Sequence, residues 1–445
     1  MATDKQISAD HNRVVMPATV AQRVAVVTVV ILFFAWLIDY IDRLVITLAL
    51  PAIGRQFSLD KTAEGAILTA FFITYALFQV PGGFLADRIG SRKTMVIAMT
   101  LWSGFTALTG AAMSYVMLIV VRLFFGVFEG IFPGASVKAI AERTTRKIRM
   151  TCNGVMLASN PLGAAVAPLI AAPAIALVGW RHAFFYVAGV GIVMAAIVWV
   201  GLPRVLPRAG TKPAAAHDEP PTQMESLTGN GLRLLTSGTM WKFTLMFFGF
   251  DIVSWGLVSW VPSYLVLQKH MTLISTGLLA SIPWFAATLS TPLGGWVFDR
   301  YLHDRQRWLI VPCMIITAGL LYLMLSSSTA GRFILFETIG MFVMFLAFMP
   351  IFGLPVRLLP AEVVGSGSAL VNFGGQAGGA IAPVVMGVLA DHVGFGAAFG
   401  FLVFGAVLAA AAALWSPQSA EEFERALRKV LGRQQPQQVG QAALG

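Results

Sequence analysis

Residues 81–88 read Pro-Gly-Gly-Phe-Leu-Ala-Asp-Arg, and this stretch decides the fold because it ends an apolar run long enough to cross a bilayer. The pattern returns at residues 294–300 as Gly-Gly-Trp-Val-Phe-Asp-Arg, again after an apolar run and shortly after a proline. Both copies share Gly-Gly-x-x-x-Asp-Arg. Such a repeat predicts that the two halves of the chain are copies of one structural unit.

The composition requires a lipid environment. Of the 445 residues, 57% are hydrophobic and 12% are charged, and the mean hydropathy is +0.77. A soluble domain has about a quarter of its residues charged. A chain of this length cannot bury so much apolar surface away from water, so the sequence predicts a protein that is solvated by a bilayer.

About twelve apolar runs are long enough to span a membrane. They lie at residues 24–50, 64–86, 94–113, 115–138, 151–177 and 182–203, and at 240–266, 273–297, 308–327, 331–357, 366–390 and 394–416. Six spans separate the two copies of the motif, so both copies end on the same side of the membrane. We therefore expect an all-α polytopic membrane protein with twelve transmembrane helices, arranged as two parallel-repeat six-helix halves.

Loop charges orient this arrangement. Lysine and arginine gather after the even-numbered spans, in the middle segment and in the tail, and the opposite loops hold few cations. Cytoplasmic loops collect such residues, so both termini are predicted to be cytoplasmic. The expected order is a cytoplasmic N-terminal segment (1–23), an N-terminal six-helix half (24–203), a cytoplasmic linker (204–239), a C-terminal six-helix half (240–416) and a cytoplasmic tail (417–445).

Charged side chains also occur inside spans, where each costs at least about 2.5–3.5 kcal/mol and is by default a functional hypothesis. The first span holds Asp39, Asp42 and Arg43, and the spacing of three places the two acids on one face. The fourth span holds Arg122 and Glu129, which are nearly two helical turns apart and face the same way. The alternative for the charges of the first span is that they lie near a membrane edge and are solvated. The alternative for Arg122 and Glu129 is a purely structural ion pair with another helix.

These charges have the chemistry of a proton-coupled anion carrier. A guanidinium binds a carboxylate through two hydrogen bonds and keeps its own charge. A carboxylate in a partly desolvated cavity is able to take up a proton. We therefore predict that opposite charges from the first and fourth spans meet in a pocket midway through the bilayer and hold an anion there.

The stretches around these charges resemble the anion:cation symporter family of the major facilitator superfamily. The loop at residues 83–93 is similar to the superfamily's signature loop, and the likeness extends over about residues 25–415. The stretches that carry it are Ile38–Arg43, Tyr75–Gly83, Arg122 to Glu129, Trp260–Leu265 and Asn372–Gly379, with Pro383. Members of this family include sugar-acid, tartrate and phthalate carriers of bacteria and glutamate and phosphate carriers of animals. We expect a multi-pass protein of the plasma membrane, the inner membrane of a bacterium.

The resemblance implies three groups of site residues. The substrate-binding group has Arg43 on the substrate carboxylate and polar contacts from Tyr40, Tyr75, Asn160, Asn372 and Gln376. The proton-coupling group is Asp42 and Glu129 with Arg122 as their partner, together with Asp39, where the family usually has asparagine. The gating group is Asp87, Arg88, Asp299 and Arg300. Asn160 replaces the glutamine of some sugar-acid carriers, which weakens a specific sugar-acid assignment.

We expect a secondary active transporter that takes up a small organic anion, such as a sugar acid or related hydroxy-acid, with protons by alternating access. An exporter or uniporter of organic anions and a non-transporting membrane sensor are the alternatives. No cluster of catalytic residues predicts an enzyme, and the two cysteines lack metal or redox spacing.

We therefore expect no metal and no cofactor, with protons as the coupling ion. The net charge of +10 would suggest a nucleic-acid partner in a soluble protein. Here it reflects the cytoplasmic loops. The expected partners are accordingly the anion, protons and lipid, with no nucleic acid, and the chain is expected to be a monomer.

Overall fold

The computed structural model describes residues 18–203, 205, 234–302, 305–354, 358–359 and 363–431, and this part of the chain is helical, with no strand. The prediction of an all-α fold is therefore confirmed. Most of the predicted linker, the first 17 residues and residues 432–445 lie outside the described part.

Ten helices of the described part are long and apolar enough to cross a membrane. Two features account for the difference from the twelve predicted spans. One is the predicted span at residues 94–113, which forms the 20-residue helix α3 (Ser91–Gly110) but is not among the ten. The other is the stretch Thr151–Gly201, which holds two predicted spans that join at Gly179, where φ is 80°. Glycine adopts this left-handed conformation without steric cost, so the helix direction changes there.

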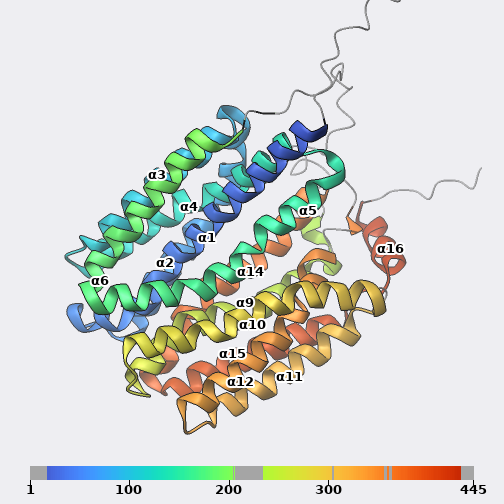
Figure 1. Ribbon diagram of the computed structural model, residues 1–445. Helices are drawn as coiled ribbons and strands as arrows, with labels where there is room; N and C mark the ends of the chain where they lie inside the picture. The colour runs from blue at the N-terminus through green and yellow to red at the C-terminus, as the bar shows by residue number, and fades with distance from the viewer. Residues whose placement is uncertain are drawn as a thin grey trace, which may run out of the picture. The chain divides into compact units, whose positions relative to one another are not determined.

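The chain divides into two compact units, and the first consists of Met1–Leu59, Ala66–Pro220 and Leu265–Phe285. In it, α1 packs on α4, α5 and α6, and α3 packs on α4 and α6 (Figure 1). The first helix therefore packs against three others, α4, α5 and α6. Besides α3, the helices of this region are α1 (Ala18–Phe57), α2 (Lys61–Ile89), α4 (Tyr115–Arg143), α5 (Arg146–Leu157) and α6 (Ser159–Gly201).

The second unit consists of Asp60–Gly65, Pro221–Tyr264 and Ala286–Gly445. In it, α11 packs on α12 and α15, and α14 packs on α15. The elements that lie wholly or partly in it are η1 (Leu234–Thr236), α9 (Gly238–Leu267), α10 (Leu273–Tyr301), α11 (Arg307–Leu325), α12 (Ala330–Leu346), η2 (Met349–Gly353), α14 (Val364–His392), α15 (Phe395–Leu414) and α16 (Ala420–Leu431). The end of α9 and the first part of α10, within Leu265–Phe285, belong to the first unit.

The repeated glycine motif has the same structural use in both units. A Cβ atom added at Gly82 would lie 2.5 Å from the Cα of Ile131 on α4. A Cβ atom added at Gly294 would lie 2.5 Å from the Cα of Leu346, at the end of α12. In each unit the first glycine of the motif is thus the point where two helix backbones meet, a task for which small residues are selected in membrane proteins.

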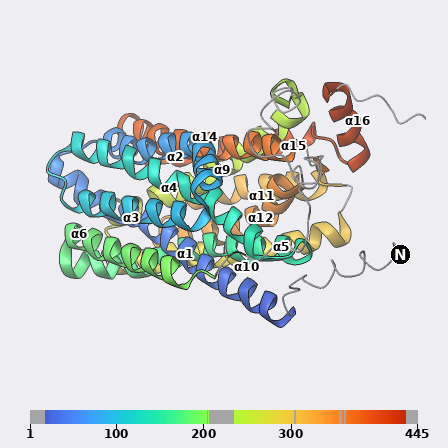
Figure 2. The same cartoon turned by 90° about the horizontal axis from the view of Figure 1, so that it is seen from above.

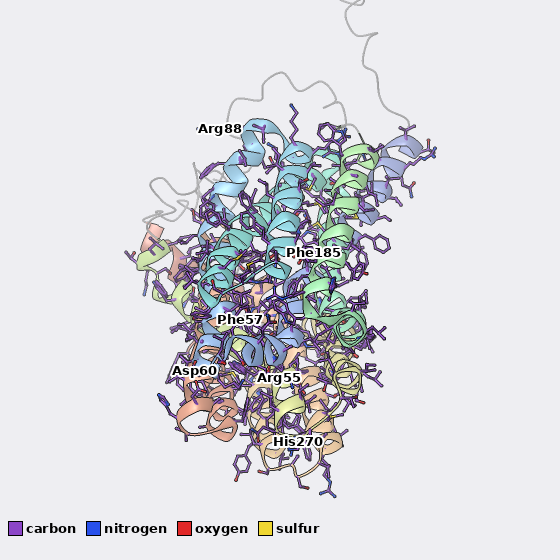
Figure 3. The ribbon with its side chains drawn as sticks, turned by 90° about the vertical axis from the view of Figure 1, so that its left-hand side faces the viewer. Arg55, Phe57, Asp60, Arg88, Phe185 and His270 are labelled. Carbon is purple, nitrogen blue, oxygen red and sulfur yellow. The ribbon has the colours of Figure 1, made fainter. Side chains whose placement is uncertain are left out.

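The two ends of the first unit carry different loops. Figure 3 shows Arg88, at the end of α2, at the opposite end from Arg55 and Phe57, at the end of α1. At the Arg88 end, Arg92 and Arg143 both donate hydrogen bonds to the backbone carbonyl of Pro203. Arginines of two helices therefore fix the chain where it leaves α6.

A short helix, α16, lies within the predicted cytoplasmic tail, beyond the end of α15 (Figure 2). Its Phe423 and Leu427 are buried, and the Phe423 ring packs against Phe243 of α9 at a centroid distance of 5.9 Å. Apolar residues four apart among charged ones are typical of an amphipathic helix. That spacing is the signal from which the sequence could have predicted α16.

We expect Gly82→Ala to lower the melting temperature of the purified protein, because the new methyl group meets the α4 backbone. Overpacking of this kind costs about 1–3 kcal/mol. The matched control is Gly104→Ala, where a Cβ atom meets nothing within 4 Å and alanine favours the helix by about 0.5–1 kcal/mol. Thermal unfolding in detergent measures both, and equal melting temperatures for the two variants would contradict the tight crossing.

Candidate functional site

Arg43 of α1 is buried between carboxylates from two helices. Its Nε donates to Oε1 of Glu129 on α4 at 2.6 Å, and its Nη2 lies 2.5 Å from the same oxygen. Its Nη2 also donates to Oδ2 of Asp39, one helical turn earlier, at 3.0 Å. None of the three side chains is more than 5% exposed. The structure therefore brings together the opposite charges that the sequence placed on separate spans.

Aromatic rings enclose the Arg43 guanidinium. Its central carbon lies 4.7 Å from the ring centre of Tyr40, 4.6 Å from that of Tyr75 and 5.3 Å from that of Phe71. Cation–π attraction of this kind is worth more when the charge is withdrawn from water. The two predicted substrate-binding tyrosines thus lie directly against the predicted carboxylate-binding arginine.

A second charged group lies between α1, α3 and α4. Oγ1 of Thr106, on α3, lies 2.8 and 2.9 Å from the two carboxylate oxygens of Asp42 and is their hydrogen-bond donor. Arg122 is 1% exposed, lies against the rings of Phe125 and Phe184, and interacts electrostatically with Asp42 and Glu129. This makes Arg122 the second buried cation of the site.

Asp39 and Asp42 make different contacts although the sequence places them on one helix face. Three residues correspond to about 300° of helical rotation, so the two side chains point about 60° apart. That angle is enough to direct Asp39 to Arg43 and Glu129, and Asp42 to Thr106 of α3. The site therefore has two neighbouring charged groups rather than one shared pair of acids.

Two glycines allow Glu129 to reach α1. A Cβ atom added at Gly130 would lie 2.6 Å from the carbonyl oxygen of Tyr75, and one at Gly126 would meet the carbonyl oxygen of Phe71. The backbones of α2 and α4 are thus in contact on either side of Glu129. Because this approach is so close, the Glu129 side chain lies beside the aromatic residues that hold Arg43.

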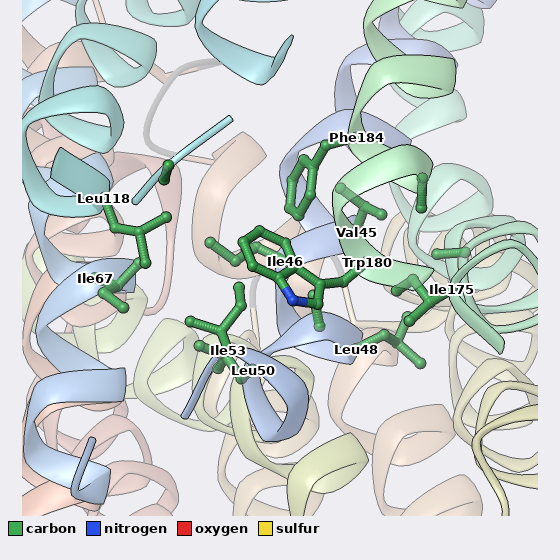
Figure 4. Close-up of a cluster of buried hydrophobic side chains, with 14 of the residues drawn as sticks. Val45, Ile46, Leu48, Leu50, Ile53, Ile67, Leu118, Ile175, Trp180 and Phe184 are labelled. Atoms are coloured by element: carbon green, nitrogen blue, oxygen red, sulfur yellow. The ribbon is translucent and has the colours of Figure 1, made fainter. Parts of the chain in front are cut away.

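Apolar side chains fill the part of α1 that follows Arg43. Val45, Ile46, Leu48, Leu50 and Ile53 are at most 1% exposed and pack with residues of α2, α4 and α6 (Figure 4). The polar side chain of this buried stretch is Thr47, whose hydroxyl donates to the backbone carbonyl of Leu44, so the charges border a largely apolar interior. Such a border makes an unpaired charge at the site costly.

Two predicted substrate-binding amides have oxygens without partners. The side-chain oxygens of Asn160, on α6, and Gln376, on α14, are buried and accept no hydrogen bond. Carbonyl oxygens of this kind are suited to accept from hydroxyl groups. Asn372, the remaining predicted contact, also lies on α14.

The predicted gating residues lie at helix ends. Asp87 pairs with Lys138 of α4 at 2.8 Å, and Lys138 also donates to the carbonyl of Ala86. Lys138 was absent from the sequence prediction, although its spacing from Gly134 and Arg143 on one helix places it near the signature loop. The other three, Arg88, Asp299 and Arg300, are exposed at the ends of α2 and α10. Within the described part of the chain, no group of three or more metal-binding side chains is present.

Comparison with known proteins identifies the family. The family model described as Major Facilitator Superfamily matches residues 32–383, which is more than half of the chain. The chain belongs to the Major Facilitator Superfamily. It is therefore a multi-pass membrane transporter and not an enzyme, as the sequence predicted.

Several relatives within the superfamily are named for sugar acids. The hexuronate transporter of Bacillus subtilis (strain 168) is 27% identical over 83% of this chain and 89% of its own length. The probable L-galactonate transporter of Escherichia coli (strain K12) is 27% identical over 88% of each chain. The probable galactarate/D-glucarate transporter of the same strain is 27% identical over 85% of this chain and 91% of its own length.

A solved structure agrees on the fold. A bacterial homologue of the human lysosomal transporter Spinster, in an inward-facing and unoccupied conformation, superposes with a TM-score of 0.72 and 17% identity. The match covers 93% of this chain and 99% of the other. At this identity the likeness concerns the major facilitator fold alone.

We expect Thr106→Val to destabilise the protein by about 1.5–3 kcal/mol, because Asp42 loses its charge-assisted hydrogen bond while the shape of the side chain is kept. Thr109→Val is the matched control, since Thr109 Oγ1 lies 3.4 Å from Arg122 and contributes a much weaker contact. Thermal unfolding of the two variants measures the difference. Equal effects would show that Thr106 does not hold Asp42.

Proposed function

We propose that this chain is a proton-coupled symporter that takes up a small hydroxylated carboxylate, such as a sugar acid, by alternating access. The observation that carries the proposal is the buried contact between Arg43 and Glu129, 2.6 Å long and made between two helices. It joins a permanent cation, which suits an organic anion, to an acid that is able to carry a proton.

Arg43 sets the class of substrate. A guanidinium recognises carboxylate groups through a planar pair of donors, and Tyr40 and Tyr75 add hydroxyl groups beside it. In the unit that holds Arg43, the unpartnered oxygen of Asn160 suits a substrate hydroxyl. Relatives named for hexuronate, galactonate and glucarate fit the same chemistry, since each of these anions combines carboxylate and hydroxyl groups.

Coupling follows from competition for one guanidinium. Glu129 occupies the Nε and Nη2 positions of Arg43, which form one of the edges that a carboxylate could use. A proton on Glu129 weakens this pair and releases the edge to the substrate. An anion and a proton then bind together more readily than either alone, which is a coupling free energy between two ligands. Asp42, with Arg122 as its partner, is proposed as a second proton carrier beside this pair.

The remaining assignments complete the proposal. Protons are the coupling ion, without a metal or a cofactor. The protein works as a monomer in the bacterial inner membrane with both termini in the cytoplasm. Asp87, Arg88, Asp299 and Arg300 act as conformational latches. The direction of transport is uptake, because an inward proton gradient drives a symported anion inward.

Arg43→Ala is expected to weaken substrate binding at least about 100-fold, because the carboxylate loses its charge-assisted hydrogen bonds. Isothermal titration of the purified protein with D-glucuronate, D-galactonate and D-glucarate measures this. The control is Arg181→Ala, an arginine whose guanidinium donates to the carbonyl of Gly110 outside the site. Affinity close to that of the unaltered protein in Arg43→Ala would remove Arg43 from the substrate site.

Glu129→Gln is expected to abolish substrate accumulation driven by a pH gradient while sparing exchange of labelled for unlabelled substrate. The amide keeps the shape of the side chain but carries no transferable proton. Uptake into proteoliposomes with and without an imposed gradient separates the two activities. Gradient-driven accumulation at the ordinary level in this variant would show that Glu129 is not the coupling acid.

A further inference from the structure

We propose that Asp39 is a tethered competitor of the substrate: its carboxylate occupies Arg43 in the empty site, yields it to the anion, and returns to expel the anion on the other side. This inference rests on the proposed function and adds a residue to it. It concerns the affinity for the anion and its release, and it adds a second proton-dependent step to the coupling proposed for Glu129.

The geometry of Asp39 fits that of a bound carboxylate. Its Oδ2 accepts from Nη2 of Arg43 at 3.0 Å, and Nη2 belongs to the same guanidinium edge that Glu129 occupies. Its Oδ1 is buried and has no hydrogen-bond partner. Arg43 is thus the one cation with which Asp39 forms an ion pair among the described residues. A substrate carboxylate that takes this edge must displace Asp39 from Nη2 as well as Glu129 from Nε and Nη2.

The charge balance of the buried site points the same way. Its buried ionisable side chains are the acids Asp39, Asp42 and Glu129 and the cations Arg43 and Arg122. With all of them ionised, three negative charges face two positive ones, so the site has one acid in excess before any anion enters. A buried net charge of the same sign as the ligand opposes its binding. Of the two acids on α1, Asp39 is the one that forms an ion pair with Arg43.

The charged and titratable groups that face Asp39 come from three helices. On α1 they are Arg43 and Asp42, on α2 the hydroxyl of Tyr75, and on α4 Glu129. Two of these are acids and one is a cation. An anion bound to Arg43 would therefore leave Asp39 with no cation of its own, and the Asp39 carboxyl group must then hold a proton.

This arrangement gives the transport cycle a release step. When the loaded site opens to a compartment of low proton concentration, Asp39 loses its proton and competes again for Arg43. The competitor is attached to the same helix one turn away, so its effective concentration is high. The anion leaves because its place on the guanidinium is taken. A neutral residue at position 39 would make this release slower in the present protein.

The test compares Asp39→Asn with the unaltered full-length protein. The amide is isosteric but is a poor ligand for a guanidinium and carries no charge. At neutral pH we expect the affinity for D-glucuronate, D-galactonate or D-glucarate, whichever the unaltered protein binds best, to rise at least about 10-fold, the loss of one charge-assisted hydrogen bond in the competing state. We also expect the maximal transport rate to fall, since release becomes slower.

Two variants control for structural effects. Asp42→Asn removes an equally buried acid of the same helix that is bonded to Thr106 and not to Arg43. It should raise the affinity less than Asp39→Asn does, because it removes one excess negative charge without removing a competitor for Arg43. Asp39→Glu keeps an acid beside Arg43 and should return the affinity toward that of the unaltered protein. Monodisperse elution in detergent establishes that each variant is folded.

The outcomes separate the two proposals. A 10-fold gain in affinity in Asp39→Asn that clearly exceeds the gain in Asp42→Asn, together with slower turnover, supports the competitor. Proton-driven transport by the unaltered protein, with unchanged or weaker binding in a folded Asp39→Asn variant, overturns the competitor and leaves the symport proposal standing. Failure of the unaltered protein to bind any of the three anions overturns both.

Discussion

A guanidinium buried inside a membrane helix is stable only if buried carboxylates accompany it, and the site of this transporter follows from that constraint. Removing one partner of a buried ion pair typically costs about 3–5 kcal/mol. Arg43 therefore needs Glu129, and Glu129 needs α4 to approach α2 closely, which Gly126 and Gly130 permit. The positions of three helices are thus tied to one ion pair, and an anion that enters must exchange places with a protein carboxylate.

This exchange of carboxylates at Arg43 explains how a buried ion pair could serve transport of an anion. The carboxylate of a substrate and the carboxylates of the protein are chemically equivalent ligands of Arg43. Whichever of them is ionised and close binds, and a proton decides which one is available. The rings of Tyr40, Tyr75 and Phe71 shield the Arg43 guanidinium from bulk water, which would otherwise hydrate it in place of a carboxylate.

Much of the fold and of the charged site could be predicted from the sequence, because membrane insertion penalises charge so strongly. The apolar runs and the repeated Gly-Gly-x-x-x-Asp-Arg motif predicted the helical fold and its two halves. The cost of charge inside a span is enough to single out Arg43, Arg122 and Glu129 from the amino-acid sequence. The meeting of Arg43 with Glu129 followed from the same argument, since two isolated charges of opposite sign in lipid have few other partners.

Other features depended on three-dimensional packing. Helical spacing alone placed Asp39 and Asp42 on one face, and only the position of α3 shows that Thr106 takes Asp42 while Arg43 takes Asp39. The packed structure alone shows that Lys138 pairs with Asp87. Helix α16 is too short to be found by hydropathy, although the spacing of its apolar residues could have predicted it. The unpartnered oxygens of Asn160 and Gln376 are likewise a property of the packed interior and not of the residue types.

The central claim is that anion and proton cross together through the Arg43–Glu129 pair, and one measurement tests it most directly. Proteoliposomes with a pH-sensitive dye inside receive an external sugar acid in the absence of any imposed gradient. The account predicts internal acidification that begins with substrate addition, scales with substrate uptake, and is absent with Glu129→Gln. Substrate uptake without any change of internal pH in the unaltered protein would contradict it.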